Sequence, residues 1–303
     1  MTCRQIPIRG KASRSPSPSM KIPSRIQPLV TDGLVDAVIR QLMSGKEATV
    51  YVVRCGDVVR CAKVYKEANK RGFHKAVDYT EGRKTRNSRQ ARAMAKGSRY
   101  GRQEQEAAWQ HAEVDALRVL ANAGVRVPTP YDFHEGVLLM ELVTDEAGEP
   151  APRLNDLALS EEEANRFHAD LIRQVVRMLC AGIVHGDLSE YNVLVDSDGP
   201  VIIDLPQAVD AAANNNARRM LERDVANLAT YFGQFSPSLL STDYGREIWS
   251  LYESGQLRPD STLTGIVKAE HRPADVDEVM EIIEMARREE AARQAGRAAA
   301  DKP

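Results

Sequence analysis

Segments rich in Val and Tyr come early in the chain, and segments with a helical spacing of apolar residues dominate its second half. Ala48–Arg54 and Asp57–Tyr65 flank Cys55-Gly56, and this short gap between two strand-like runs predicts a β-hairpin. Pro130–His134 and Val137–Val143 predict a second hairpin in the same way. Strands that precede helices indicate an α+β fold, with a small β-rich part followed by a larger helical part.

Helical spacing first occurs in the run that follows Thr31, LVDAVIRQL, where we expect a short amphipathic helix capped by Thr31 or Asp32. A longer helix is predicted from Glu104 to Ala123, ending before Gly124. Its apolar stripe consists of Trp109, Ala112, Ala116, Leu117 and Leu120. Glu113 lies four residues after Trp109 and therefore falls on or beside this stripe.

A third helix is predicted to begin at Ser160, because Ser160 and Glu163 have the spacing of a capping box, and to stop at Gly182. Two short strands, Val193–Val195 and Val201–Leu205, follow it on either side of a turn. The rest of the chain is mainly helical, and a helix is expected around Arg218–Phe232.

Three regions are expected along the chain. Residues 1–24 are basic and rich in Ser-Pro, which predicts a disordered tail, and translation starting at Met20 would remove most of it. Residues 25–240 form the folded domain, with a β-rich lobe at about 25–143 and a helical lobe at about 150–240. Residues 241–303 form a helical extension with a frayed Ala/Arg/Glu tail.

Composition narrows the class of protein only a little. The 303 residues carry a formal net charge of −2, and 43% of them are hydrophobic, as in ordinary soluble proteins. The four cysteines form no CxxC pair, which argues against a zinc site or a disulfide framework and fits a reducing compartment. Since the chain has neither an apolar run of membrane-spanning length nor a signal sequence, we expect a cytoplasmic protein without a membrane partner.

The strongest chemical signal is His185-Gly-Asp-Leu-Ser-Glu-Tyr-Asn192, which is followed by Asp204 twelve residues after Asn192. Phosphoryl transfer needs a carboxylate near the acceptor hydroxyl and hard oxygen ligands that hold Mg²⁺ against the phosphates. The spacing is that of protein kinases, H-x-D-x-x-x-x-N and a later D. Asp187 would orient or deprotonate the acceptor, and Asn192 and Asp204 would bind the metal. The competing interpretation is that all three only cap local turns.

A second signal is Lys63 in Arg60-Cys-Ala-Lys-Val-Tyr65, which matches the pattern of the strand lysine that reaches the α- and β-phosphates of ATP. Such a lysine needs a helix carboxylate to hold it, and Glu113 is the best placed. Glu104 and Glu106 precede the apolar stripe and are weaker alternatives. Lys63 as one of many solvated lysines is the other interpretation.

Two further segments are candidates for nucleotide contacts. Ser44, Gly45, Lys46 and Glu47 precede Val50 and are expected to cover the phosphates, although a single glycine is equally compatible with an ordinary turn. The strand Val137–Val143 leads into a linker and would hold the adenine edge, while core packing explains its apolar pattern equally well. The candidate contacts there are Met140, Glu141 and Val143.

With these motifs in view, the chain resembles the RIO family of atypical protein kinases, nearest its type-one branch and bacterial relatives. The resemblance covers about residues 25–235 and rests on Ser44–Tyr51, Ala62–Lys66, the Trp109/Glu113 helix, His185–Asn192 and Ile203–Gln207. It implies a trimmed bilobal kinase fold, use of ATP with Mg²⁺ or alternatively Mn²⁺, and a serine/threonine kinase or ATPase activity. In that family the aspartate that matches Asp204 binds metal and can accept phosphate.

Departures from ordinary protein kinases accompany this resemblance. Gly186 replaces an arginine, Ser189 stands where many kinases have a lysine, and Leu205-Pro206 replaces Phe-Gly. We also find no A-P-E segment, and the span between Asp204 and the helix around Arg218–Phe232 leaves little room for a peptide-docking loop. We therefore do not expect peptide substrates to be recognised in the usual way, and the sequence does not identify the protein substrate.

Residues 66–102 are the most basic segment, with twelve Lys and Arg against three Asp and Glu. Their even spread suits a surface for phosphate backbones, so RNA or a ribosomal particle is a candidate partner, while a solvated loop is the alternative. RIO proteins have a loop here that can be autophosphorylated. By that resemblance, candidate sites are Thr80, Thr85, Ser88 and Ser98.

Two other functions use the same motifs. A small-molecule phosphotransferase of the aminoglycoside or choline type also has H-G-D-x-x-x-x-N, but the segment Gly45–Tyr51 and the scarcity of acidic or aromatic clusters near the C-terminus argue against it. An ATP-gated assembly factor for RNA or ribosomes is the other alternative, and it is compatible with kinase chemistry.

Overall fold

The computed structural model describes residues 20–45, 47–66 and 99–266, without side chains for 99–109. Several predictions concern parts of the chain outside the described residues. They are those for Lys46, for Thr80, Thr85, Ser88 and Ser98, for the side chains of Glu104, Glu106 and Trp109, for the first nineteen residues and for the tail after residue 266. The helices are α1 (Gln27–Thr31), α4 (Arg99–Asn122), α5 (Glu161–Cys180), α6 (Ala217–Phe232) and α7 (Tyr244–Glu253). The strands are β1 (Ala37–Ser44), β2 (Ala48–Cys55), β3 (Val58–Tyr65), β4 (Pro130–His134), β5 (Val137–Glu141), β6 (Ile183–Val184), β7 (Val193–Asp196), β8 (Gly199–Ile202) and β9 (Val209–Asp210).

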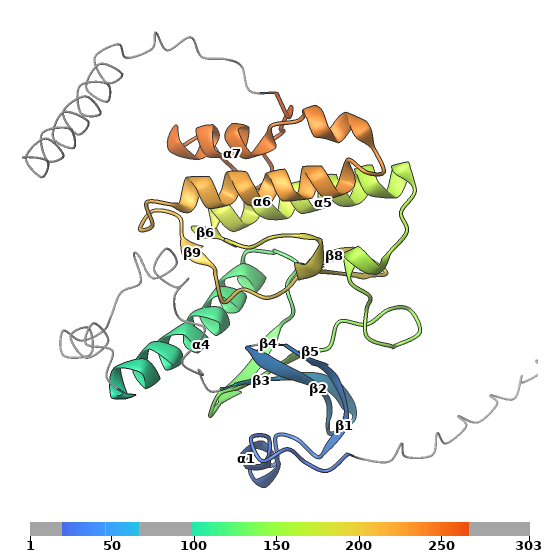
Figure 1. Ribbon diagram of the computed structural model, residues 1–303, viewed down its shortest axis with the longest axis vertical. Coiled ribbons are helices and arrows are strands. Elements are labelled where there is room, and N and C mark those ends of the chain that lie inside the picture. The colour runs from blue at the N-terminus through green and yellow to red at the C-terminus, as the bar shows by residue number, and fades with distance from the viewer. Residues whose placement is uncertain (1–19, 46, 67–98, 267–303) are drawn as a thin grey trace, which may run out of the picture. The chain divides into compact units, whose positions relative to one another are not determined.

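The first five strands form one antiparallel sheet in the order β1-β2-β3-β5-β4, drawn in blue and green in Figure 1. Both predicted hairpins are present, β2–β3 around Gly56 and β4–β5 around Gly136, and each glycine has a positive φ. In this register Val50 and Leu138 lie on either side of Lys63. The sheet therefore places Lys63 on its central strand.

The helix predicted after Thr31 is wrong, because Ala37–Ser44 is strand β1. The helix in this region is α1, which ends at Thr31 and is followed by Gly33 with φ 73°. The pairing of β1 with β2 has two irregularities, between Val38 and Arg40 and between Gln41 and Met43. Such bulges interrupt the alternation of a strand, so the apolar residues of this segment acquire the three-and-four spacing of a helix.

The N-terminal segment packs against one face of this sheet. Ile26 and Leu29 are fully buried there against a cluster that includes Val53 and Leu139. The Met20 N–H donates to the Val38 carbonyl at 3.0 Å, and Ile22 packs against the same cluster. Residues 20–24 of the predicted disordered tail therefore belong to the folded part.

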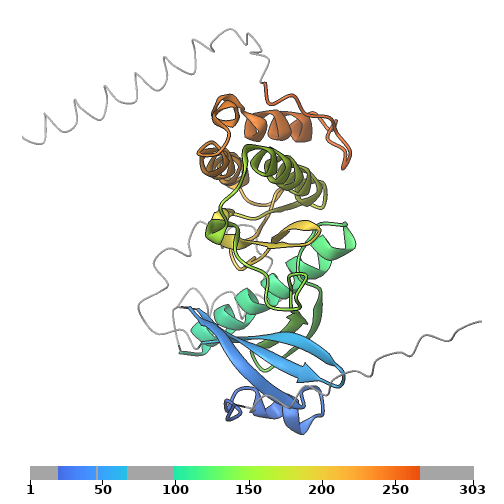
Figure 2. The same ribbon diagram turned by 90° about the vertical axis from the view of Figure 1, so that its right-hand side faces the viewer.

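The helical part is built on α5, α6 and α7, which are stacked in Figures 1 and 2. Ser160 begins α5 with the predicted capping box, both of whose reciprocal hydrogen bonds with Glu163 are present. Ile248 and Trp249 of α7 belong to the same buried cluster as α5 and α6. The packed core thus continues beyond residue 240, into the region expected to be an extension.

Two small hairpins carry the candidate chemistry between α5 and α6. Strands β7 and β8 pair on either side of the turn before Gly199, and β6 pairs with β9. The loop from His185 to Asn192 runs from β6 to β7, and Asp204 follows β8. None of the helices in the described ranges is long and apolar enough to cross a membrane.

Candidate active site

Lys63 meets two carboxylates. Its Nζ donates to Glu113 Oε1 at 2.6 Å and to Asp204 Oδ1 at 2.8 Å, which joins β3, α4 and the segment after β8. Lys63 and Glu113 are buried, and the Asp204 side chain is 44% exposed. Burial acts to lower the pKa of Lys63, but the charges of Glu113 and Asp204 outweigh it and raise that pKa. Lys63 is therefore held as a cation.

Asp204 is held in a conformation that few non-glycine residues adopt. Its φ is 65°, in the left-handed region, which costs free energy in non-glycine residues and is over-represented at active sites. Burial acts to raise the pKa of Asp204, yet the Lys63 ammonium and its hydrogen bond hold that pKa below the ordinary value. The side chain is thus an anion with one oxygen bound to Lys63.

Asp187 lies in a loop whose backbone is anchored from α6. The buried Asp224 accepts from the Gly186 N–H at 2.8 Å, and Asn227 Nδ2 donates to the Leu188 carbonyl at 3.3 Å. Gly186 itself has φ 81°. Desolvation raises the pKa of Asp187, in the opposite direction to that of Asp204, although the nearby Arg223 partly offsets this. Gln207 Nε2 lies 3.4 Å from Asp187 Oδ2, which is a weak hydrogen bond.

His185 connects this loop to the segment that carries Asp204. Its Nδ1 accepts from the Asp187 N–H at 3.2 Å, and its Nε2 lies 3.1 Å from the Ile203 carbonyl oxygen. An imidazole that accepts at one nitrogen and donates at the other is neutral. Burial accordingly lowers the pKa of His185 to about 4.

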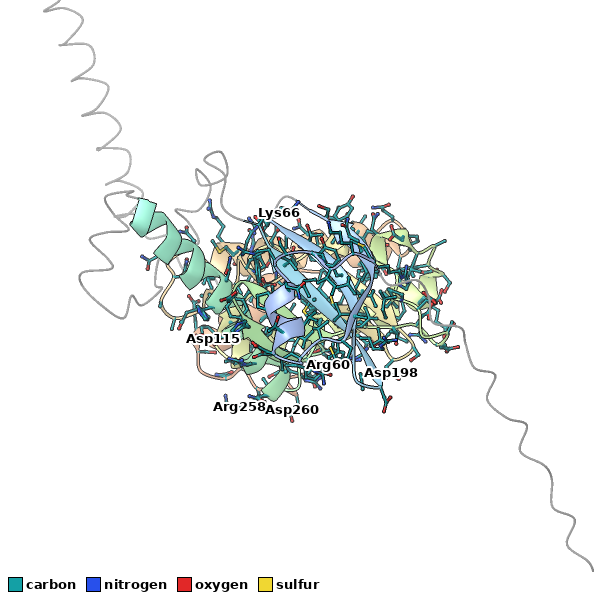
Figure 3. The ribbon with its side chains drawn as sticks, turned by 90° about the horizontal axis from the view of Figure 1, so that it is seen from below. Arg60, Lys66, Asp115, Asp198, Arg258 and Asp260 are labelled. Atoms are coloured by element: carbon teal, nitrogen blue, oxygen red, sulfur yellow. The ribbon has the colours of Figure 1, made fainter. Side chains whose placement is uncertain are left out.

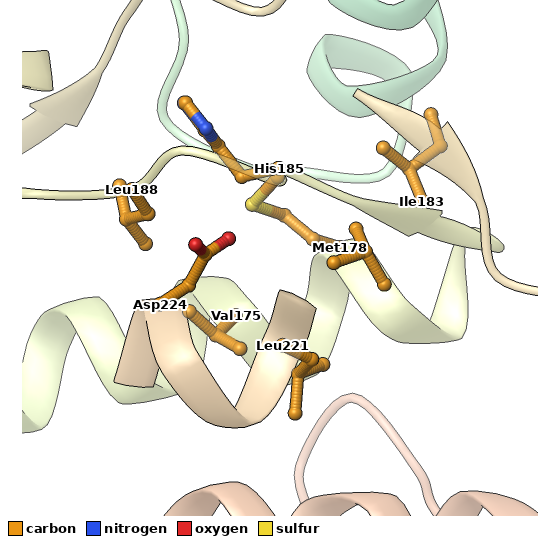
Figure 4. A pocket seen from close by; sticks show the side chains of 8 residues that line it. Val175, Met178, Ile183, His185, Leu188, Leu221 and Asp224 are labelled. Carbon is orange, nitrogen blue, oxygen red and sulfur yellow. The ribbon is translucent and has the colours of Figure 1, made fainter. Parts of the chain in front are cut away.

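A small cavity of about 10 Å³ lies under the loop, with room for about one water molecule. His185 and Asp224 line it together with apolar side chains from α5 and α6, as Figure 4 shows. Desolvation raises the pKa of Asp224 to about 7, even though Arg223 and the backbone hydrogen bonds act the other way. The cavity is too small for a nucleotide and is therefore not the substrate site. The residues that line it support the loop above, as Asp224 does through the Gly186 N–H.

The oxygen atoms of Asp204 and Asn192 are of the kind that binds a magnesium ion. Asn192 Nδ2 donates to the Asp187 carbonyl at 2.9 Å, which leaves the amide oxygen of Asn192 as the atom available to a metal. Carboxylate and amide oxygens are hard ligands of the kind that Mg²⁺ takes. Within the described residues no three His, Cys, Asp or Glu side chains converge on one point, so further ligands would come from phosphate and water.

The turn between β1 and β2 is held by a lysine from the neighbouring strand end. Lys66 Nζ, at the end of β3 (Figure 3), donates to Ser44 Oγ at 2.9 Å and to the Gly45 carbonyl at 2.6 Å. Desolvation and the nearby Asp204 carboxylate raise the pKa of Glu47, which places this turn beside the Asp204 cluster. The turn was predicted from the sequence, but the role of Lys66 in holding it was not.

The predicted adenine-edge residues lie at the end of β5 and just beyond it. Met140 is partly buried and packs against the main core, and Val143 is buried in a small cluster of its own with Val201. The Glu141 carboxylate accepts from the Thr129 hydroxyl at 2.9 Å and from its N–H, so this side chain is engaged in structure. Val50 is half-buried on β2.

Sequence reasoning also missed Tyr65 and Asp224. Tyr65 follows Lys63 by two residues and therefore shares its face of β3. Asp224 interrupts the apolar stripe of α6 between Leu221 and Val225, and a carboxylate on a buried helix face is a signal that was available.

Residues 49–244 match the RIO domain family. The RIO-type serine/threonine-protein kinase Rio1 of Haloferax volcanii is 36% identical over 209 residues, which are 68% of this chain and 67% of the relative. The serine/threonine-protein kinase rio1 of Schizosaccharomyces pombe is 28% identical over 244 residues, which are 77% of this chain but only 46% of the relative.

Among solved structures, the fold resembles the Rio2 kinase of Chaetomium thermophilum in its ADP/Mg²⁺-phosphoaspartate complex. The TM-score is 0.54 at 21% identity, with 78% of this chain and 68% of that chain covered. This likeness confirms the α+β, protein-kinase-like fold expected from the motifs. Together with the match over residues 49–244, it leads to one conclusion: the chain belongs to the RIO family of serine/threonine-protein kinases.

Proposed function

We propose that the protein transfers the γ-phosphate of ATP, with Mg²⁺, as an atypical serine/threonine kinase or an ATPase. The observation that carries the proposal is the single cluster in which Lys63 joins Glu113 to Asp204, while His185 connects that segment to Asp187. Phosphoryl transfer requires this set of a phosphate-binding cation, a metal carboxylate and a second carboxylate for the acceptor. The ADP and Mg²⁺ of the Chaetomium Rio2 complex agree with this choice of nucleotide and metal.

In this proposal each residue has one task. Lys63, held by Glu113, contacts the α- and β-phosphates, and Asp204 with Asn192 holds the metal. A bound Mg²⁺ would neutralise the charge that develops on the transferred phosphoryl group. Asp187 accepts the proton of the attacking hydroxyl, because its raised pKa makes it the more basic of the two aspartates.

A second route lets Asp204 accept the phosphoryl group. A carboxylate oxygen would form a bond to the γ-phosphorus while the bond to ADP breaks, and water would then release inorganic phosphate. The phosphoaspartate in the Chaetomium Rio2 complex motivates this route. A hydroxylamine-sensitive label at Asp204 after incubation with Mg-ATP would support it, and a label resistant to hydroxylamine would contradict it.

The physiological partners are a finer question. We propose a protein hydroxyl as the acceptor, and RNA or a ribosomal particle as a docking partner for the basic residues 66–102. Of this segment only residue 66 and residues 99–102 are described, so support for the partner comes from the charge pattern in the sequence. Binding of ribosomal RNA that does not weaken with salt would contradict it. A cytoplasmic location stays a prediction.

The direct test is transfer of the γ-phosphate from labelled ATP to a protein acceptor and to water. Wild type, Asp187→Ala and Asp204→Ala would be compared at equal concentration. We expect Asp187→Ala to abolish transfer while nucleotide still binds, and Asp204→Ala to lose metal-dependent binding as well. Full activity in Asp187→Ala would overturn the assignment.

A further inference from the structure

Tyr65 contacts the same glutamate as Lys63. The two residues are separated by one position on β3, so both side chains lie on one face of the strand. The Tyr65 hydroxyl donates to Glu113 Oε2, while Lys63 Nζ donates to Oε1. The Lys63 ammonium also lies 5.5 Å from the centre of the Tyr65 ring. Each oxygen of the buried carboxylate thus has its own donor.

The position of the Tyr65 hydroxyl is fixed by its surroundings. Tyr65 is 1% exposed, and its ring meets Phe133 of β4 edge-on at 6.2 Å between centroids. Its backbone N–H donates to the Gly136 carbonyl at 3.0 Å, and Arg25 donates to its carbonyl at 3.4 Å. The ring therefore has little freedom to follow Glu113 if α4 moves, and it marks the place where the carboxylate has to be.

Lys63 has partners other than Glu113. In the structure Lys63 also donates to Asp204, and it has to exchange that partner for nucleotide phosphates when Asp204 takes a metal. Glu113 is 2% exposed, and a buried carboxylate whose hydrogen bonds weaken is costly. The Tyr65 hydroxyl is a second, neutral donor to this carboxylate, and it has no part in binding Asp204.

We propose that Tyr65 is a positioning residue that holds Glu113, and through it Lys63, in the phosphate-binding arrangement whether or not nucleotide is bound. This inference rests on the proposed function. It implies that α4 stays engaged without any activating event, since Glu113 has two donors on one strand. In this role Tyr65 acts on the nucleotide only through Glu113 and Lys63.

The test is Tyr65→Phe, which keeps the ring and removes only the hydroxyl. The matched control is Tyr51→Phe, because Tyr51 is also buried in the sheet but its hydroxyl has no hydrogen bond among the described residues. We expect Tyr65→Phe to raise KM for Mg-ATP about tenfold, with a smaller change in kcat, since a hydrogen bond to a charged group is lost. Tyr51→Phe should match wild type, and circular dichroism would confirm that both variants fold.

A double variant separates positioning from general packing. With Glu113→Ala the hydroxyl has nothing to hold, so adding Tyr65→Phe should change KM less than twofold further. An unchanged KM in Tyr65→Phe, or independent multiplicative effects of the two substitutions, would overturn the inference while leaving the proposed function intact. Wild-type protein that neither binds nor turns over Mg-ATP would overturn the proposed function itself.

Discussion

The two aspartates of the site lie in opposite kinds of environment. Asp204 lies in a cluster of charged side chains: Lys63 donates to it and to Glu113, and the pKa of Asp204 is held below its ordinary value. Around Asp187 the contacts are mostly with backbone: Asp224 and Asn227 fix the loop, and desolvation raises the pKa of the carboxyl. The same residue type therefore has its pKa shifted in opposite directions by its neighbours.

In the proposed function, this difference separates a metal ligand, Asp204, from a proton acceptor, Asp187. A carboxylate kept ionised by a cation coordinates a metal well, and one with a raised pKa accepts a proton more readily. His185 connects the two regions, because its ring accepts from Asp187 and donates to Ile203, next to Asp204. Substitutions at four residues test this difference between the two aspartates: Asp187, Lys63, His185 and Asp224.

The largest effect is expected at Asp187. Asp187→Asn keeps the size of the side chain and removes its ability to accept a proton, so we expect kcat to fall about 1000-fold with KM for ATP nearly unchanged. Initial rates of γ-phosphate transfer would measure this. Asp198→Asn, in the exposed turn after β7, is the matched control and should leave the rate unchanged. A fall of less than tenfold at Asp187 would remove it from the chemistry.

Next in size is the effect of Lys63→Met on stability. Glu113 and Asp204 would then face each other without their cation, and breaking a buried ion pair costs about 3 kcal/mol or more. Chemical denaturation at pH 7 would measure the free energy of unfolding. Lys66→Met removes a lysine from the same strand end, where its contacts are exposed, and should cost about 1 kcal/mol or less.

His185 predicts a dependence of stability on pH. Its pKa is about 4 in the fold against 6.5 ordinarily, so the unfolded chain binds more protons between these values and stability falls as pH decreases below 6.5. Asp224 acts in the opposite direction, since its pKa of about 7 makes the folded state bind more protons below pH 7. Each contribution is therefore seen only as a difference between variants.

His185→Gln should remove the destabilisation, so wild type should lose about 2 kcal/mol relative to this variant between pH 7 and pH 5. For Asp224→Asn the sign is opposite: wild type should gain stability relative to this variant as the pH falls from 7 to 5. Denaturation curves at several pH values would measure both. A pH-independent difference for His185→Gln would mean that His185 has the same pKa in the folded and the unfolded chain, which would contradict the burial of a neutral ring.

The smallest effect is expected for Asp224→Asn on catalysis. Asn keeps an oxygen for the Gly186 N–H but loses the charge, which weakens the anchor of the loop. We expect kcat to fall about tenfold while binding of nucleotide is kept. Transfer rates and nucleotide titration would separate the two. An equal loss in both would indicate that the whole site had been disturbed.

The hairpins, the capped helix and the carboxylate motifs could be predicted because their signals are local. Ser160 and Glu163 determine a cap within four residues, and the pairing of Ala48–Arg54 with Asp57–Tyr65 needs only a short turn. The motif from His185 to Asn192 joins its functional residues within one loop. The spacing of these residues could therefore be recognised from the sequence without knowledge of the fold.

What could not be predicted depends on distant contacts. Strand β1 was mistaken for a helix because its bulges are defined by pairing with β2. The anchoring by Asp224 depends on α6 packing beneath a loop some 38 residues earlier. Tyr65 was overlooked because its role requires Glu113, which lies 48 residues away, at the other end of a hydrogen bond. Periodicity within a segment carries no such information.

The central claim is that Asp204 binds the metal and that Asp187 does not. Calorimetric titration of ADP with and without Mg²⁺, on wild type, Asp187→Asn and Asp204→Asn, tests it most directly. We predict that Mg²⁺ strengthens ADP binding equally in wild type and Asp187→Asn and has little effect in Asp204→Asn. Loss of the Mg²⁺ effect in Asp187→Asn, or its full retention in Asp204→Asn, would contradict the account.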